Sequence, residues 1–186
     1  TGKPVRAKYR RLDPVKLQQA KQYFEDMCKA GICQRSSSEW SSPLHMVQKE
    51  DGSYRPCGDY RRLNARTKKI DYSLPNLKDF AAKLSGKTFF SSIDLVKAFW
   101  QIPVDSESIP KTAVITPFGS FVFLRMPFGV MNASSTFQTL IDEVLGDLDC
   151  VFVYLDDLLV FSSSLQEHER DVRKVLQRLR EAGLCF

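Results

Sequence analysis

The sequence predicts an α+β fold, in which an antiparallel sheet is backed by helices on one face. Two observations lead to this prediction. From residue 88 onward the expected order of elements is strand, strands, helix, hairpin, helix. The two helices expected there also carry apolar stripes at helical spacing, which suit packing against a sheet. Their members are Phe137, Leu140, Ile141, Val144 and Leu145 in the first, and Val172, Val175, Leu176, Leu179 and Ala182 in the second.

The N-terminal part predicts a basic arm followed by a helix. Residues 1–12 lack periodicity and are expected to form an extended arm. Asp13 is a favourable N-cap, and Pro14 suits the first helical turn. Gly31 is expected to end the helix, because glycine readily adopts the left-handed conformation found there.

A hairpin follows the helix. Residues 44–49 and 54–60 predict two strands, joined by the turn signal Asp51-Gly52. Pro56 lies in the second strand and has no N–H for a sheet ladder, so we expect an edge strand or a bulge.

Further elements are expected from residue 76 onward, each marked by a periodic run or a turn signal. They are a short helix over 76–84, a strand over 88–94, a turn at 118–120 between two strands, a helix starting at Asn132, a hairpin of residues 151–155 and 158–161, and a helix with the capping box Ser164 and Glu167.

Length and composition allow one domain, or one domain with a smaller lobe. The chain has 186 residues, of which 43% are hydrophobic. No apolar run is long enough to cross a bilayer. The chain starts at Thr1 without a methionine and ends directly after a helix-like stretch, so we expect it to be cut from a longer polypeptide.

The net charge of +5 is unevenly distributed. Residues 1–70 hold 16 Lys and Arg against 7 Asp and Glu, whereas residues 71–186 hold 11 against 15. A basic half suits a polyanion such as nucleic acid. An ordinary solvated basic face explains the charge equally well, and charge alone leaves both interpretations open.

The five cysteines and two histidines predict no zinc site. No CxxC pair occurs, and His45 and His168 lie far apart in the sequence. We therefore expect reduced thiols in an intracellular protein.

The most informative feature is the pair Asp156-Asp157 between two apolar runs. Turns favour Asp for conformational reasons alone, so an ordinary turn is the alternative. The apolar neighbours predict a sheet centre, where unpaired carboxylates are costly unless they meet a cation. No Lys or Arg lies between Arg125 and Arg170. A divalent ion would offset the cost, and oxygen ligands select Mg²⁺ or Mn²⁺.

A third acid, Asp94, ends the apolar strand that starts at Phe89. Its alternative role is a helix N-cap at a strand exit. Three carboxylates at strand ends of one sheet could hold two metal ions about 3.5–4 Å apart and clamp an in-line phosphoryl transfer. This chemistry needs positioning and charge neutralisation rather than a covalent nucleophile. A different two-metal enzyme, such as a nuclease, remains a competing hypothesis.

Several motifs in order carry a family resemblance. Tyr154-Leu155-Asp156-Asp157 resembles the Y-x-D-D box of reverse transcriptases. The other motifs are residues 49–56 and 59–64, Asp94-Leu95 with Phe99, Gln101 and Ile102, residues 109–113, Met126-Pro127-Phe128-Gly129, Asn132-Ala133, and Thr136-Phe137-Gln138. The residues in these motifs are most similar to those of Gypsy-type long-terminal-repeat retrotransposons.

The resemblance implies a right-hand polymerase with fingers and palm. Residues 1–87 would be mainly fingers with the N-terminal arm, and residues 88–186 mainly palm. The two parts could interleave, with part of 103–130 in the fingers. The thumb, connection and ribonuclease H regions of the family are absent from these residues.

The resemblance also implies residue roles. Asp94, Asp156 and Asp157 would be catalytic and bind two Mg²⁺ ions, or Mn²⁺, with the Leu95 carbonyl assisting. The nucleotide would contact Lys49, Arg55, Phe99, Phe128 and Gly129. Lys49 and Arg55 would hold the triphosphate, although a solvated hairpin explains them too. Phe99 would be the steric gate that excludes a 2′-hydroxyl, with a core role as the alternative. Phe128 stands where retroviral enzymes usually carry Gln.

The implied function is an RNA-directed DNA polymerase that transfers nucleotides from dNTP to a primer 3′-hydroxyl. Its implied partners are an RNA or DNA template-primer, dNTP and the rest of a Pol polyprotein, namely protease, thumb, ribonuclease H and integrase, with no membrane. The implied location is the cytoplasm, in a virus-like particle, or the nucleus. The alternative is a catalytically inactive, nucleic-acid-binding remnant of a retroelement.

Overall fold

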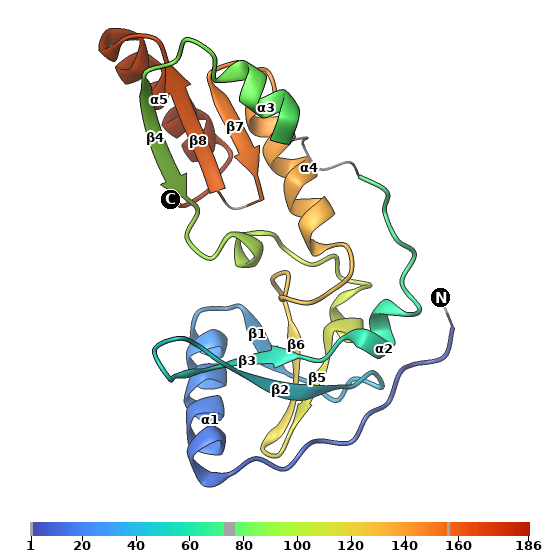
Figure 1. The fold of residues 1–186 in the computed structure, drawn as a ribbon. Coiled ribbons are helices and arrows are strands. Elements are labelled where there is room, and N and C mark those ends of the chain that lie inside the picture. The colour runs from blue at the N-terminus through green and yellow to red at the C-terminus, as the bar shows by residue number, and fades with distance from the viewer. Residues whose placement is uncertain (1, 73–76, 156) are drawn as a thin grey trace. The chain divides into compact units, whose positions relative to one another are not determined.

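The computed structural model describes residues 2–72, 77–155 and 157–186 (Figure 1). The chain divides into two compact units. Unit 1 contains residues 1–69 and 102–133, and unit 2 contains residues 70–101 and 134–186. No helix within the described ranges combines the length and the apolar character that crossing a membrane requires.

Unit 1 is built on a five-stranded sheet with the strand order β1-β6-β5-β2-β3. Its strands are β1 (Cys33–Arg35), β2 (Ser42–Gln48), β3 (Tyr54–Gly58), β5 (Val114–Thr116) and β6 (Gly119–Phe123). Its helices are α1 (Pro14–Lys29), α2 (Arg61–Asn64) and the 3₁₀ helix η2 (Ile109–Thr112). All pairings are antiparallel except that of β2 with β5, which is parallel.

The predicted ends of α1 are confirmed. The Asp13 carboxylate accepts a hydrogen bond from the Lys16 amide at 2.9 Å, which satisfies one of the free N–H groups of the first turn. Gly31 follows the C-cap with φ of 67°, the left-handed conformation expected of a helix-ending glycine. The buried face of α1 places Phe24 against Phe121, with ring centroids 4.7 Å apart.

The predicted hairpin is formed by β2 and β3. Gln48 pairs with Tyr54 at its end, and Gly52 in the turn has φ of 78°. Pro56 lies in β3, which is an edge strand of the sheet, as predicted. The edge position tolerates proline because one side of the strand has no ladder to complete.

Unit 2 contains an antiparallel sheet with the strand order β4-β8-β7. The strands are β4 (Phe89–Asp94), β7 (Val151–Tyr154) and β8 (Asp157–Ser162). The helices are α3 (Leu77–Lys83), α4 (Ala133–Leu145), α5 (Leu165–Glu181) and the 3₁₀ helix η1 (Ala98–Gln101). Figure 1 shows the predicted sheet backed by α4 and α5.

The contact between α5 and the sheet is partly polar. His168 of α5 is buried and lies 2.8 Å from the Ser91 hydroxyl of β4 and 3.1 Å from the Ser162 hydroxyl of β8. Ser162 also donates to the carboxylate of Asp171 at 2.6 Å. Because successive strand residues point to opposite faces, the face toward α5 is the one that carries Ser91 and Ser162.

The capping box at α5 differs in one partner from the prediction. The Ser164 hydroxyl accepts from the Glu167 amide at 3.3 Å, as expected. The Glu167 carboxylate accepts from the amide of Ser163, one residue before the cap, at 3.0 Å. The two bonds together still satisfy free amides at the helix start.

Candidate active site

The register of β4 and β8 places two of the three predicted acids directly opposite each other. Asp94 pairs with Asp157, and both strands are antiparallel members of one sheet. This confirms the predicted adjacency of the Asp94 strand and the acidic hairpin. Asp156, the remaining acid, lies outside the described residues.

The surroundings of these acids differ from the expectation. The apolar neighbours of Asp156-Asp157 predicted a sheet centre, but Asp157 is exposed, as is Asp94. Both acids lie at the ends of their strands, as expected. Alternation along the strands puts both side chains on the face opposite to Ser91 and Ser162, and therefore away from α5. The apolar residues next in sequence, such as Leu158, fill the core instead.

The electrostatics of the pair favour a bound cation. Neither Asp94 nor Asp157 has an ion-pair partner within the residues that the structure describes. Directly opposite residues in an antiparallel pair have Cβ atoms about 4.5–5.5 Å apart, and like charges at this distance are destabilising. A divalent ion would reverse the sign of this interaction. A cation would therefore relieve the repulsion between the two neighbouring carboxylates. It would not be needed to offset the burial of either acid, because both are exposed.

The donors at this strand end suit a hard cation. The two carboxylates offer oxygen donors, and Leu95, which follows Asp94 directly, is 2% exposed. Carboxylate and carbonyl oxygens are the ligands that Mg²⁺ and Mn²⁺ prefer. Within the described residues, which leave out Asp156, no group of three or more His, Cys, Asp or Glu is close enough to hold a metal.

Gln138 supports the acidic hairpin from α4, a role that the sequence motif did not reveal. Its side chain is 0% exposed, and its Oε1 accepts from the amide of Leu155 at 3.0 Å. Leu155 has φ of 55°, a left-handed conformation that is unfavourable for a residue with a branched side chain. The buried amide therefore holds the strained residue that precedes the two aspartates.

Gln101 supports the other side of the strand end. Its Nε2 donates to the carbonyl of Val96 at 2.7 Å and to that of Cys185 at 2.9 Å. Its Oε1 accepts from the Cys185 amide at 2.8 Å. One side chain thereby ties the loop after Asp94 to the segment that follows α5.

Phe99 lies on η1, five positions after Asp94, and is half-buried. Its ring packs edge-on against that of Phe137, with centroids 5.6 Å apart. Phe137 is fully buried in α4. Phe99 thus has a packing contact, and it also keeps part of its ring accessible.

In unit 1, Arg55 and Phe128 lie together. The Arg55 guanidinium lies over the Phe128 ring at 5.1 Å from its centroid, which is a cation–π contact. The buried Nε of Arg55 has no hydrogen-bond partner in the described part of the chain. An aromatic ring at position 128 therefore supports the arginine, where a glutamine would offer a polar contact instead.

The neighbouring loop is held by Asn64. Its Nδ2 donates to the Gly129 carbonyl at 2.8 Å, and its Oδ1 accepts from the Met131 amide at 3.0 Å. Gly129 has φ of 89°, so a side chain there would be strained. Lys49 is exposed at the end of the β2–β3 hairpin, where its amide donates to Ser53 at 2.8 Å.

The 109–113 motif has a structural role that its family resemblance did not indicate. The Thr112 hydroxyl accepts from the Phe123 amide at 2.8 Å, and the Thr112 carbonyl accepts from the buried Tyr60 hydroxyl at 2.8 Å. These bonds connect η2, β6 and the residue before α2 within unit 1.

Comparisons of this sequence with a family model and with curated proteins indicate the same family. The family described as reverse transcriptase (RNA-dependent DNA polymerase) matches residues 47–186. The Retrovirus-related Pol polyprotein from transposon 297 of Drosophila melanogaster is 41% identical over 168 residues, covering 86% of this chain and 16% of that protein. The Transposon Tf2-3 polyprotein of Schizosaccharomyces pombe is 35% identical over 177 residues, covering 94% of this chain and 13% of that protein.

Solved structures share the fold. A foamy viral protease-reverse transcriptase in complex with double-stranded DNA has a TM-score of 0.91 and 26% identity, covering all of this chain and 33% of that one. The native prototype foamy virus protease-reverse transcriptase has a TM-score of 0.84 and 25% identity, covering 98% of this chain and 24% of that one.

The fold is that of reverse transcriptases whose structures have been solved. The chain belongs to the reverse transcriptase family, and its relatives are Pol polyproteins of transposons, in agreement with the Gypsy-type resemblance. It spans only a small part of the length of these relatives.

Proposed function

We propose that the chain forms the fingers and palm of an RNA-directed DNA polymerase, which transfers nucleotides from dNTP to the 3′-hydroxyl of a primer. The observation that carries the proposal is the direct pairing of Asp94 with Asp157 at one strand end, in a member of the reverse transcriptase family. Unit 1 would be the fingers and unit 2 the palm. In this assignment residues 70–87 belong to the palm and residues 102–133 to the fingers.

The acids would act as ligands. Asp94, Asp156 and Asp157 would hold two divalent ions, Mg²⁺ in the first place and Mn²⁺ as a substitute, with the Leu95 carbonyl as a further donor. Such ions supply activation of the 3′-hydroxyl and neutralisation of the triphosphate and of the leaving pyrophosphate. Gln138 and Gln101 would keep the two ligand-bearing segments in place before substrate arrives.

The family resemblance assigns five further residues to the nucleotide. Arg55 and Lys49 would bind the triphosphate, since a guanidinium offers a planar fork of donors to phosphate oxygens. The Arg55 Nε without a described partner supports this role, because buried polar atoms usually find one. Phe99 would stand beneath the sugar, and Phe128 and Gly129 would border the nucleotide or template.

The whole protein would be a Pol polyprotein with an RNA or DNA template-primer as its partner. The proposal is tested by primer extension on an RNA template, with the full-length Pol protein that carries this chain. We expect Asp94→Asn and Asp157→Asn each to lower the rate at least about a thousandfold, since each loses several kcal/mol of charge stabilisation. Chelation of divalent ions should abolish extension.

Asp149→Asn is the matched control, because Asp149 is an exposed acid just before β7. This variant should extend primers at the normal rate. Normal extension by Asp94→Asn or Asp157→Asn would overturn the assignment of the site. No extension by the unmodified protein, with template binding retained, would favour the inactive nucleic-acid-binding remnant instead.

A further inference from the structure

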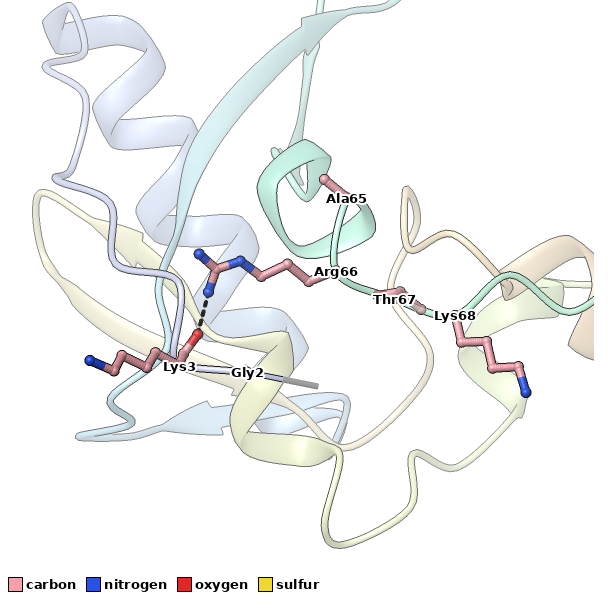
Figure 2. Close-up of a pocket in the computed structure, with 6 residues that line it drawn as sticks. All are labelled: Gly2, Lys3, Ala65, Arg66, Thr67 and Lys68. Atoms are coloured by element: carbon pink, nitrogen blue, oxygen red, sulfur yellow. Dashed lines mark hydrogen bonds between the residues drawn. The ribbon is translucent and has the colours of Figure 1, made fainter.

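The segment that follows α2 is one of the chain connections between the two units, which divide between residues 69 and 70. On the unit 1 side, residues 65–68 line an open pocket together with Gly2 and Lys3 (Figure 2). The Arg66 guanidinium donates to the Lys3 carbonyl there, as the dashed line in Figure 2 shows. The segment is therefore attached to the N-terminal arm before it passes into unit 2.

On the unit 2 side, Tyr72 attaches the same segment to α4. The Tyr72 hydroxyl donates to Oδ2 of Asp142 at 2.5 Å, and both residues are half-buried. This hydrogen bond raises the pKa of Tyr72 above its ordinary value of 10.0, so the phenol keeps its proton at neutral pH and remains a donor. Within the described residues Asp142 has no ion-pair partner, which leaves its carboxylate to neutral donors.

The second oxygen of Asp142 binds Gln138, which lies one turn earlier on α4 and therefore on the same face of the helix. The Gln138 Nε2 donates to Oδ1 of Asp142 at 3.0 Å and lies 3.5 Å from the Val153 carbonyl. An ionised carboxylate only accepts hydrogen bonds, so it selects the nitrogen of the Gln138 amide and turns Oε1 the other way. There Oε1 accepts from the Leu155 amide at 3.0 Å.

These hydrogen bonds form one continuous series, which we call the Tyr72–Leu155 network: Tyr72, Asp142, Gln138 and Leu155. Because Gln138 is fully buried, an amide turned the wrong way would leave buried polar groups unpaired. The network ends at a residue with φ of 55°, which directly precedes Asp156 in the sequence. Such a backbone conformation persists only where the surrounding contacts hold it.

We propose that Tyr72 is a positioning residue for nucleotide transfer. Through Asp142 it fixes the orientation of the Gln138 amide, and the amide in turn fixes the backbone that leads into the two adjacent aspartates. Tyr72 acts through these partners and takes no part in the chemical step. The proposal rests on the proposed function for the reaction itself, whereas the effect of Tyr72 on Leu155 is a property of the protein without substrate.

The test is a double-mutant cycle in the full-length Pol protein that carries this chain. Tyr72→Phe removes only the hydroxyl, and Gln138→Met removes the amide at the centre of the network. Hydrogen exchange at the Leu155 amide, measured by mass spectrometry without substrate, should accelerate at least about threefold in Tyr72→Phe, the effect of weakening one hydrogen bond. In the Gln138→Met protein the same change should have no further effect, because members of one network act non-additively.

Primer extension on an RNA template gives the second readout. Tyr72→Phe should lower kcat at least about threefold and change KM for dNTP by less than about twofold, because the network supports the acids and does not hold the nucleotide. Asp142→Asn should act in the same direction, since its side-chain NH₂ group would face a donor where the carboxylate accepts. A variant that merely loosened the fold would lower Tm without this separation of kcat from KM.

Thr139→Val is the matched control, because it removes a hydroxyl of α4 that donates to the Ser135 carbonyl at 2.9 Å, outside the network. It should change neither Leu155 exchange nor kcat. Unchanged exchange in Tyr72→Phe, or additive effects of Tyr72→Phe and Gln138→Met, would overturn the proposal and make Tyr72 an attachment of the connecting segment only. Failure of the proposed function differs from both results: the unmodified protein would not extend primers, while Tyr72→Phe would still accelerate exchange.

Discussion

The ring of Phe99 is half-buried against Phe137, so a packing contact and the proposed role in sugar selection belong to the same residue. We expect Phe99→Ala, in the full-length enzyme, to raise the ratio of kcat/KM for ribonucleotides to that for deoxyribonucleotides by at least about tenfold, or about 1.4 kcal/mol. Removal of the ring takes away a steric collision with the 2′-hydroxyl and leaves the acids intact. Stability should fall by less than the roughly 3–5 kcal/mol typical of a fully buried Phe.

The deciding measurements are the two kcat/KM values together with a melting curve. Phe137→Leu is the control, because Phe137 is fully buried and touches the same ring. It should lower Tm and leave the substrate ratio unchanged. If Phe99→Ala behaves in the same way, Phe99 is a packing residue and the gate lies elsewhere.

Gln138 joins two elements, α4 and the β7–β8 hairpin, through one buried amide. Gln138→Met keeps the volume but leaves the Leu155 amide without its acceptor, which should cost about 1–3 kcal/mol of stability. Hydrogen exchange at the Leu155 amide should accelerate, and primer extension should fall by more than the melting curve explains. Gln177→Met, at an exposed site on α5, should change neither quantity. Unaltered exchange at Leu155 would contradict the supporting role of Gln138.

Asp59 links the arm to α2, and this link depends on pH. The Arg61 and Arg10 guanidinium groups hold the pKa of Asp59 well below its ordinary value of 3.8, with Arg61 the larger cause. A carboxyl group whose pKa is lowered by folding stabilises the fold at pH values above its ordinary pKa. For Asp59 this contribution is lost progressively as the pH falls below 3.8. Because Arg61 is largely exposed, the contribution is no more than about 1 kcal/mol.

We therefore expect Asp59→Asn to melt at a lower temperature than the unmodified chain at pH 7, with the difference shrinking as the pH drops below about 4. Melting curves between pH 7 and pH 3 measure this difference. Asp149→Asn, at an exposed position just before β7, is measured alongside as the control variant. A constant difference across the whole range would mean that Asp59 stabilises the chain by packing rather than by charge.

At the scale of the whole molecule, local signals predicted the elements well. Asp13, Gly31 and the Asp51-Gly52 turn each define a boundary through their own backbone preferences, so the structure confirms them. The order of elements from residue 88 also predicted that Asp94 and the acidic hairpin belong to one antiparallel sheet, and the register of β4 with β8 confirms it. The helix and turn boundaries depend on residues close together in the sequence, whereas the pairing of Asp94 with Asp157 joins distant residues and followed from the order of the elements.

Other features that depend on distant partners were not predictable. The parallel pairing of β2 with β5 joins residues about seventy positions apart, and no local pattern encodes it. The apolar neighbours of Asp157 wrongly predicted a sheet centre, whereas Asp157 is exposed, because apolar neighbours in a strand fill the opposite face as readily as the same one. The hydrogen bond between the Leu155 amide and Gln138 could not be predicted, because the sequence does not show where α4 lies relative to the hairpin.

Pro56 also bears on how copies of the molecule coexist at high concentration. β3 ends the five-stranded sheet, and an edge strand is a template on which a strand of another copy can add. Proline lacks the N–H that such an added strand would need at that position. Pro56 thereby protects the free edge of the sheet against edge-to-edge aggregation, which is a benefit to solubility rather than to catalysis.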